Sequence, residues 1–137
     1  MRIDLPDTKI FLGETTFPVR WSDMDALGHV NNAVYFTYLE IVRVDWLRRL
    51  GVGVEASAQG PVVANAFCNF IVQLDHPCDV VAKAYAGAPG RASFDFFSTF
   101  ERADRPGRVC AAGGATVVWF DFRAQKPVSR LKSRPMR

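Results

Sequence analysis

The segment from Val34 to Leu50 carries apolar side chains around most of a helical circumference and leaves only a narrow polar stripe. A helix that is apolar nearly all round is typical of a protein interior, whereas a surface helix shows one apolar face. Arg48 and Arg49 stand in the last turn, where cations oppose the negative end of the helix dipole, and Gly51 suits the end of a helix. The pattern therefore predicts one buried helix that ends near Leu50.

After this helix the apolar period changes from that of a helix to that of a strand. Between Pro61 and Leu74 every even position is apolar, while the odd positions mix polar and apolar side chains. Shorter segments follow, separated by turns rich in Gly, Pro and Asp. The predicted strands are Glu14 to Trp21, Pro61 to Leu74, Val80 to Ala86, Ser93 to Arg102, and Val109 to about Phe122.

An antiparallel sheet that must cover a helix apolar on all sides has to curl around it. We therefore predict an α+β fold in which a curled five-stranded antiparallel sheet wraps around a long central helix. Such a sheet leaves an edge, and it leaves an outer face that carries Phe67, Ile71 and Phe97. Uncovered edges and apolar faces favour the pairing of subunits over a monomer.

Length and composition indicate one ordered globular domain over residues 1–137. The chain is 49% hydrophobic and 23% charged, which is unlike a disordered chain. We expect an ordered core over about residues 14–128, followed by a basic, Pro-containing C-terminal tail. The net charge of +3 is too small to indicate nucleic-acid binding, although it would help to attract a phosphorylated ligand.

Cysteine usage and hydropathy bear on the cellular compartment. Cys68, Cys78 and Cys110 are odd in number and include no closely spaced pair, so the sequence favours neither disulfides nor a zinc site. The chain lacks the apolar run of a signal peptide, and no stretch approaches the roughly 20 apolar residues of a membrane helix. The prediction is a cytoplasmic protein with no membrane partner and no bound metal.

The segment from Trp21 to Asn32 combines two carboxylates, a glycine, a histidine and two asparagines directly before the predicted helix. Gly28 permits a sharp turn, so Asp25 can fold back against the backbone N–H groups that begin the helix. Such N–H groups polarise a carbonyl and hold an oxyanion, while a carboxylate attacks the carbon or activates a water. The competing interpretation is that the Asp and Asn residues only cap the helix and shape a loop.

The residues of this segment also carry a resemblance to a known family. The run from Val19 to Asn32, continued by Tyr35, Tyr38, Leu39 and Glu40, resembles the signature of the 4-hydroxybenzoyl-CoA thioesterase-like branch of the hotdog-fold acyl-CoA thioesterases. The resemblance extends from Thr16 to about Val128. It implies a hotdog domain, assembled as a homodimer or homotetramer, that hydrolyses an acyl-CoA to the free acid and coenzyme A. It implies no metal or redox cofactor, because coenzyme A is part of the substrate.

Carried over by position, the resemblance assigns roles to single residues. Asp25 matches the catalytic carboxylate, acting as nucleophile or general base, and the backbone N–H of Asn32 matches the group that polarises the thioester carbonyl. His29 either touches the thioester or only holds the loop by hydrogen bonds, which is the commoner role of such a histidine. Tyr35 is a candidate substrate contact or a core residue, and Arg91 either meets the phosphates of coenzyme A or is a solvated turn arginine.

Two other functions on the same fold compete with hydrolysis. A non-catalytic acyl-CoA-binding or sensing module would hold the ligand without turnover, yet a binder gains little from the anion of Asp25 beside an electron-rich carbonyl oxygen. A hydratase or dehydratase would need a paired Asp and His elsewhere on the fold, whereas the only histidines are His29 and His76. We therefore expect hydrolysis.

Overall fold

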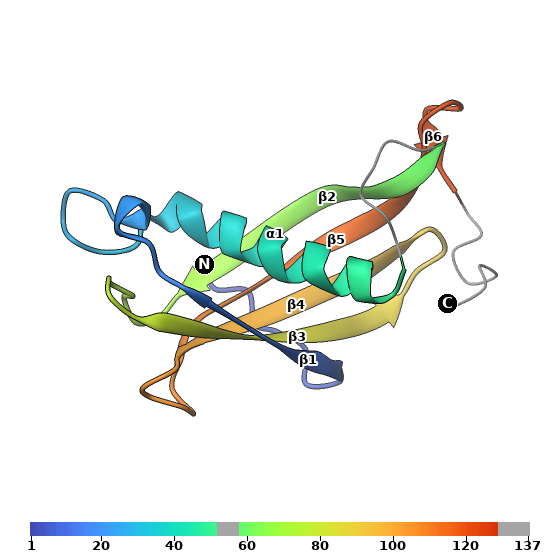
Figure 1. Cartoon of the computed structure of the whole chain (residues 1–137). Coiled ribbons are helices and arrows are strands. Elements are labelled where there is room, and N and C mark those ends of the chain that lie inside the picture. Colours follow the sequence, from blue (N-terminus) through green and yellow to red (C-terminus); the bar gives the residue numbers. More distant parts are fainter. Residues whose placement is uncertain (52–57, 129–137) are drawn as a thin grey trace.

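The computed structural model describes residues 1–51 and 58–128. Its elements, in chain order, are β1 (Ile10–Pro18), the short 3₁₀ helix η1 (Trp21–Asp23), α1 (Asn32–Arg49), β2 (Gln59–Phe70), β3 (Asp79–Pro89), β4 (Ser93–Arg102), β5 (Val109–Asp121) and β6 (Lys126–Pro127). The described part of the chain thus has an α+β fold, with α1 lying against one sheet (Figure 1). Most of the predicted basic C-terminal tail lies outside the described residues.

The strand order of the sheet is β1-β3-β4-β5-β2, with β6 paired to β5, and every neighbouring pair is antiparallel. The sheet therefore has six strands rather than the predicted five. The sixth strand arises because the chain turns back on β5, so that Lys126 pairs with Asp121 and Pro127 pairs with Phe120. Because α1 connects the two edge strands β1 and β2, it crosses one face of the sheet (Figure 1).

The first strand ends earlier than predicted. The sequence predicted a first strand from Glu14 to Trp21, but β1 ends at Pro18, and Trp21 begins η1. A carboxylate oxygen of Asp23 accepts a hydrogen bond from the N–H of Arg20 (2.8 Å), which draws the chain into the 3₁₀ turn. Side-chain capture of a backbone N–H competes with a strand ladder in this way, and hydropathy does not register it.

The core lies between α1 and the side of the sheet that faces it. α1 contributes Tyr35, Tyr38, Leu39 and Val42, and the sheet contributes mainly Val80, Ala82, Ala84, Phe96, Phe100, Cys110, Ala111 and Val117. The opposite side of α1 stays open, with Phe36 exposed by 41% and Ile41 by 39%. The prediction of a helix buried on all sides is therefore wrong for a single chain, because the sheet covers only one side. Within the described ranges no helix is long and apolar enough to cross a membrane.

The outer face of the sheet is less exposed than predicted. Phe97 is only 8% exposed, because its ring lies over glycines of the two neighbouring strands. A Cβ placed on Gly87 would come within 2.9 Å of this ring, and one on Gly114 within 2.6 Å. Ile71, in contrast, remains 47% exposed. Because Gly87 and Gly114 have no side chains, the Phe97 ring can lie over them and become buried, although the alternation of the strand alone would leave it on the surface.

The edge strand β2 is exposed on both faces along its middle. All residues from Val62 to Ala66 are exposed, including Val62 at 37% and Val63 at 39%. The sequence predicted that even positions here belong to the core, which is wrong for one chain. The reason is that nothing in residues 1–51 or 58–128 packs over this stretch of the edge.

Candidate active site

Residues 23–31 form a closed loop that leads into α1. The N–H of Asp25 donates to the carbonyl of His29 (2.8 Å), and the N–H of Asn31 donates to the carbonyl of Asp23 (3.0 Å). At the tip, Gly28 has a φ of 81°, in the left-handed region that costs a glycine little. The two ends of the loop are thus tied together by backbone hydrogen bonds.

Asp25 is exposed in this loop and uses one of its two carboxylate oxygens to hold it. Oδ1 accepts hydrogen bonds from the N–H groups of Leu27 (2.9 Å) and His29 (3.3 Å). Oδ2 has no hydrogen-bond partner among the residues that the structure describes. Asp25 therefore combines a fixed orientation with an oxygen that is available for chemistry.

The start of α1 leaves one backbone donor without an acceptor. The side-chain oxygen of Asn31 accepts from the N–H of Ala33 (2.9 Å), and the carbonyl of Asn31 accepts from the N–H of Val34 (2.8 Å). The N–H of Asn32 comes directly before these two in the chain and has no acceptor within residues 1–51 and 58–128. It stands at the positive end of the helix dipole, which favours binding of negative charge. Asn31 is thus the helix cap, and the cap leaves the Asn32 amide free.

The turn around Asp75-His76-Pro77 braces the loop from the sheet side. The carbonyl of Leu74 accepts a hydrogen bond from the N–H of Val30 (2.8 Å). The N–H of His76 lies 3.2 Å from Sδ of Met24, and Met24 forms an isolated antiparallel bridge with Val30. His76 therefore contributes its backbone to the support of the loop.

Asp23, which the sequence offered only as the less likely catalytic carboxylate or as a loop-shaping residue, lies at the base of the loop. It is only 5% exposed, and its Oδ2 accepts a hydrogen bond from the hydroxyl of Tyr38 (2.9 Å). Burial and this hydrogen bond raise the pKa of Tyr38 well above its ordinary value, so the phenol stays protonated and donates at neutral pH. No period in the sequence links positions 23 and 38, because they meet only once the loop has closed.

Tyr35, a predicted substrate contact, lies inside the core of the single chain. It is 3% exposed, and its ring centroid lies 5.8 Å from that of Tyr38, 5.1 Å from Phe70 and 6.4 Å from Phe100. Burial raises the pKa of Tyr35 to about 12, against the opposing effect of a hydrogen bond with the backbone of Leu74. The ring packs the start of α1 against Phe70 and Phe100 of the sheet, and contact with a substrate stays a prediction.

The loop with Asp25 and the start of α1 with Asn32 both lie within the part of the chain that matches a known family. A model of the thioesterase-like superfamily matches residues 19–132, which spans both residues. The chain belongs to this superfamily. Its fold is accordingly the hotdog fold, and the class of activity associated with it is thioester hydrolysis.

Solved structures resemble this thioesterase-like chain over most of its length. The PA2801 protein of Pseudomonas aeruginosa, a candidate thioesterase, is 35% identical with a TM-score of 0.85, covering 90% of this chain and 95% of that one. A candidate acyl-CoA thioesterase from Xanthomonas campestris is 32% identical with a TM-score of 0.76, covering 87% and 98%. The BH1999 gentisyl-coenzyme A thioesterase is 25% identical with a TM-score of 0.75, covering 85% and 95%.

Two predicted site residues of this superfamily member, His29 and Arg91, make no side-chain hydrogen bond to Asp25 in the described part of the chain. His29 is half-buried and shapes the loop through its backbone, while its imidazole makes no hydrogen bond to any described residue. Arg91 is exposed in the turn between β3 and β4, at the end of the sheet opposite to the start of α1 (Figure 1). A single chain therefore does not bring Arg91 and Asp25 together, and both assignments stay predictions.

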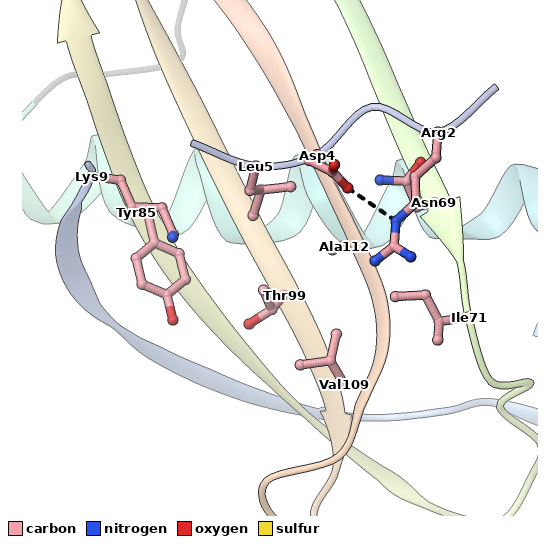
Figure 2. Close-up of a pocket in the computed structure, with 10 residues that line it drawn as sticks. All are labelled: Arg2, Asp4, Leu5, Lys9, Asn69, Ile71, Tyr85, Thr99, Val109 and Ala112. Carbon is pink, nitrogen blue, oxygen red and sulfur yellow. Dashed lines mark ion pairs between the residues drawn. The ribbon is translucent and has the colours of Figure 1, made fainter. Parts of the chain in front are cut away.

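A surface hollow of about 350 Å³ lies on the outer face of the sheet, away from α1. Figure 2 shows it between the N-terminal segment, with Arg2 and Asp4 in an ion pair, and sheet residues such as Thr99 and Val109. None of the predicted site residues lines it. In the described part of the chain no three His, Cys, Asp or Glu side chains come together to hold a metal ion.

Proposed function

We propose that this protein hydrolyses an acyl-CoA thioester to the free acid and coenzyme A, with Asp25 as the catalytic carboxylate. One observation carries the proposal: a single closed loop holds a carboxylate with one uncommitted oxygen and ends at a helix whose first N–H has no acceptor among the described residues. A donor and an anion so arranged suit acyl transfer. Membership in the thioesterase-like superfamily supports the same reaction.

The Asn32 N–H would receive the carbonyl oxygen of the thioester and hold the negative charge that develops on it. Asp25 would then act in one of two ways. As a nucleophile it forms an acyl bond through Oδ2 while the C–S bond breaks, and water hydrolyses the resulting anhydride. As a general base it takes a proton from water, whose oxygen attacks the carbonyl carbon. Either route consumes one water, and the departing thiolate takes a proton to give coenzyme A.

Neither route needs a metal or redox cofactor, so we propose that none is used. His29 donates its backbone N–H to the other carboxylate oxygen of Asp25, Oδ1 (3.3 Å), and its side chain would contribute to substrate contact. Tyr35 would support the site from the core.

We further propose that the active unit is a homodimer, or a homotetramer built from such dimers. The open middle of β2 and the uncovered apolar residues of α1 support this assembly, because a second chain would cover both. The β3–β4 turn, which contains Arg91, and the loop before α1, which contains Asp25, lie at opposite ends of the sheet (Figure 1). Arg91 would therefore meet the phosphates of a substrate bound at a site of the other subunit.

Thiol release from a panel of short, long and aromatic acyl-CoAs, by wild type and by Asp25→Asn, tests the proposal. An Asn side chain still offers an oxygen to Leu27 and His29, so the loop should keep its shape while kcat/KM falls by roughly 10²–10⁴-fold. Asp45→Asn is the matched control, because Asp45 is a carboxylate at the far end of α1, and its kcat/KM should match that of wild type.

Two results would contradict the proposal. An Asp25→Asn variant that turns over like wild type would remove Asp25 from the catalytic role. Binding of acyl-CoAs without thiol release from any member of the panel would favour the acyl-CoA-binding module instead.

A further inference from the structure

Asp23 makes an unusual set of contacts for a carboxylate beside a candidate active site. Its side chain is 6% exposed, and Oδ2 alone accepts two hydrogen bonds, from the Tyr38 hydroxyl (2.9 Å) and from the Arg20 N–H (2.8 Å). Oδ1 lies 3.7 Å from Nε of Arg20. Burial of a carboxylate costs folding free energy unless such partners satisfy it. A buried carboxylate at this position therefore suggests a specific role.

These contacts tie three parts of the chain at one residue. The Tyr38 hydroxyl comes from the second turn of α1, and the Arg20 N–H comes from the end of the segment that follows β1. The main-chain carbonyl of Asp23 accepts the N–H of Asn31, the cap of α1. Asp23 therefore links the base of the loop to the helix twice, once through its side chain and once through its backbone.

Both proposed catalytic groups depend on this link. Asn32 directly follows Asn31, and Asp25 lies two residues after Asp23 in the loop of residues 23–31. If the Asp23–Tyr38 bond were lost, the loop could shift relative to α1 without unfolding of either element. A displacement of about 1 Å between catalytic groups can cost roughly 10²-fold in rate.

We propose that Asp23 is a positioning residue, which, together with Tyr38, sets the Asp25 carboxylate against the Asn32 amide. This inference rests on the proposed function of Asp25 and Asn32. The charge of Asp23 matters as well as its shape. Asparagine in its place would point its NH₂ group in one of two directions. The NH₂ would face either the Arg20 guanidinium, or the Tyr38 hydroxyl and the Arg20 N–H. Guanidinium and backbone N–H groups are donors only, so they offer the NH₂ no acceptor.

The chain contains a matched control for the Asp23–Tyr38 bond. Thr15 of β1 donates its hydroxyl to Oδ2 of Asp45 at the other end of α1, also at 2.9 Å. Tyr38→Phe and Thr15→Val each remove one hydroxyl that binds a carboxylate, and both keep the shape of the side chain. Each should lower stability, but only Tyr38→Phe lies beside the candidate site.

Steady-state thiol release should separate positioning from plain structural support. We expect Tyr38→Phe to lower kcat about 10-fold and Asp23→Asn about 100-fold, with KM changed less than about 3-fold, while Thr15→Val keeps the wild-type kcat. In the Asp23→Asn background, Tyr38→Phe should add little, because the two act as one unit. Equal kcat values for Tyr38→Phe and Thr15→Val would overturn the proposal.

Hydrogen exchange gives a readout that does not depend on turnover. In Tyr38→Phe the Asn31 amide should exchange about 10-fold faster than in wild type, whereas in Thr15→Val it should be unchanged. An unchanged Asn31 rate in Tyr38→Phe would overturn the positioning role, even if the protein hydrolysed no acyl-CoA. Suppose that Asp25→Asn is inactive, while Tyr38→Phe is fully active and its Asn31 amide exchanges as slowly as in wild type. The proposed function then stands, and only the role of Asp23 fails.

Discussion

Asp23 and Asp25 show how far environment separates two identical side chains near each other in the chain. Asp23 is 5% exposed and is held by the helix and by the end of the β1 segment, whereas Asp25 is exposed and keeps one oxygen free of described partners. Burial with full hydrogen bonding suits a structural anchor, and an accessible anion suits an attack on a carbonyl. At this scale the division of labour follows from contacts rather than from residue type.

The proposed donor is a backbone group, so proline at its position provides a direct test. Asn32 is the first residue of α1, where proline is well tolerated, and Asn31 has φ −61° and ψ 137°, which a following proline accepts. We expect Asn32→Pro to remove the N–H, to lower kcat by roughly 10²-fold and to leave the fold intact. Asn32→Ala keeps the N–H and should retain most of the activity.

Thiol release and circular dichroism on both variants check this. Similar kcat values for a folded Asn32→Pro variant and for Asn32→Ala would contradict the role of this amide.

Ser98 on β4 offers a stability test that does not involve the site. Its side chain is fully buried, and its hydroxyl is the one buried side-chain group without a hydrogen-bond partner in the described part of the chain. Ser98→Ala removes an unsatisfied hydroxyl from the core. We expect the free energy of unfolding to stay equal or to rise by about 1 kcal/mol, measured by chemical denaturation. A loss of more than about 1 kcal/mol would mean that the hydroxyl is bonded in solution.

At the scale of elements, two residues at the end of β4 hold the turns that support the candidate site. Arg102 pairs with Asp75 (2.7 Å) in the turn that braces the loop, and with Asp104 (3.0 Å) in the turn to β5. Its neighbour Glu101 accepts a hydrogen bond from the N–H of Gly107 (2.8 Å) in the same turn. Two adjacent residues of one strand therefore hold a loop on one side and a turn on the other.

The contacts of Glu101 predict a dependence of stability on pH. The Gly107 N–H and then Lys83, at 3.1 Å, hold the pKa of this carboxyl below its ordinary value of 4.5 against the opposing effect of burial. A lowered folded-state pKa stabilises the protein fully above the ordinary value, and this contribution is lost as the pH falls through the lowered one. Glu101→Gln should cost about 1–3 kcal/mol of unfolding free energy at pH 7.

Denaturation at a series of pH values checks this. The difference between wild type and Glu101→Gln should shrink below about pH 4.5, and a difference that is independent of pH would be inconsistent with the cause given. Asp104→Asn is a suitable comparison, since Asp104 is an exposed carboxylate in the same turn and should have a much smaller effect.

At the scale of the whole molecule, a single chain leaves its apolar surface unevenly covered. The large exposed apolar residues of β2 and of α1 are Val62, Val63, Phe70, Phe36 and Ile41. The other edge strand, β1, is also exposed at Ile10, by 67%. What distinguishes β2 is a continuous run of exposed residues from Val62 to Ala66 on both faces. An uncovered apolar edge of this kind is a site for pairing with another chain.

Charges on this edge should block the proposed assembly. Lysine disfavours edge pairing, so the double variant Val62→Lys with Val63→Lys should shift the protein from a dimer or tetramer toward a monomer in size-exclusion chromatography with light scattering. If the partner completes the site, thiol release should fall with the loss of assembly. Ile10→Lys on the opposite edge is the control and should keep the wild-type size. A monomeric wild type would refute the assembly.

The local features of this protein could be read from the order of its residues. The helix, the sequence of strands and the loop with Asp25 and Asn32 all depend on neighbours within a few positions, where periodicity and capping chemistry act. The end of β1 and the sixth strand were missed because each depends on a local turn that hydropathy does not register. The burial of Phe97 could not be read from the sequence, because it depends on partners distant in the chain. Phe97 is buried through Gly87 and Gly114, which lie on other strands.

The sequence by itself determined which chemical groups stand at the start of the helix, because a capping asparagine, a glycine and a carboxylate act over short stretches of backbone. Only the tertiary structure decided what each carboxylate does. Asp23 becomes buried because Tyr38 and Arg20 reach it across the closed loop, and Asp25 stays exposed because its own loop satisfies one oxygen. Likewise, only the packing of α1 on one side of the sheet shows which apolar residues a single chain leaves uncovered, since burial is a property of surfaces brought together in space.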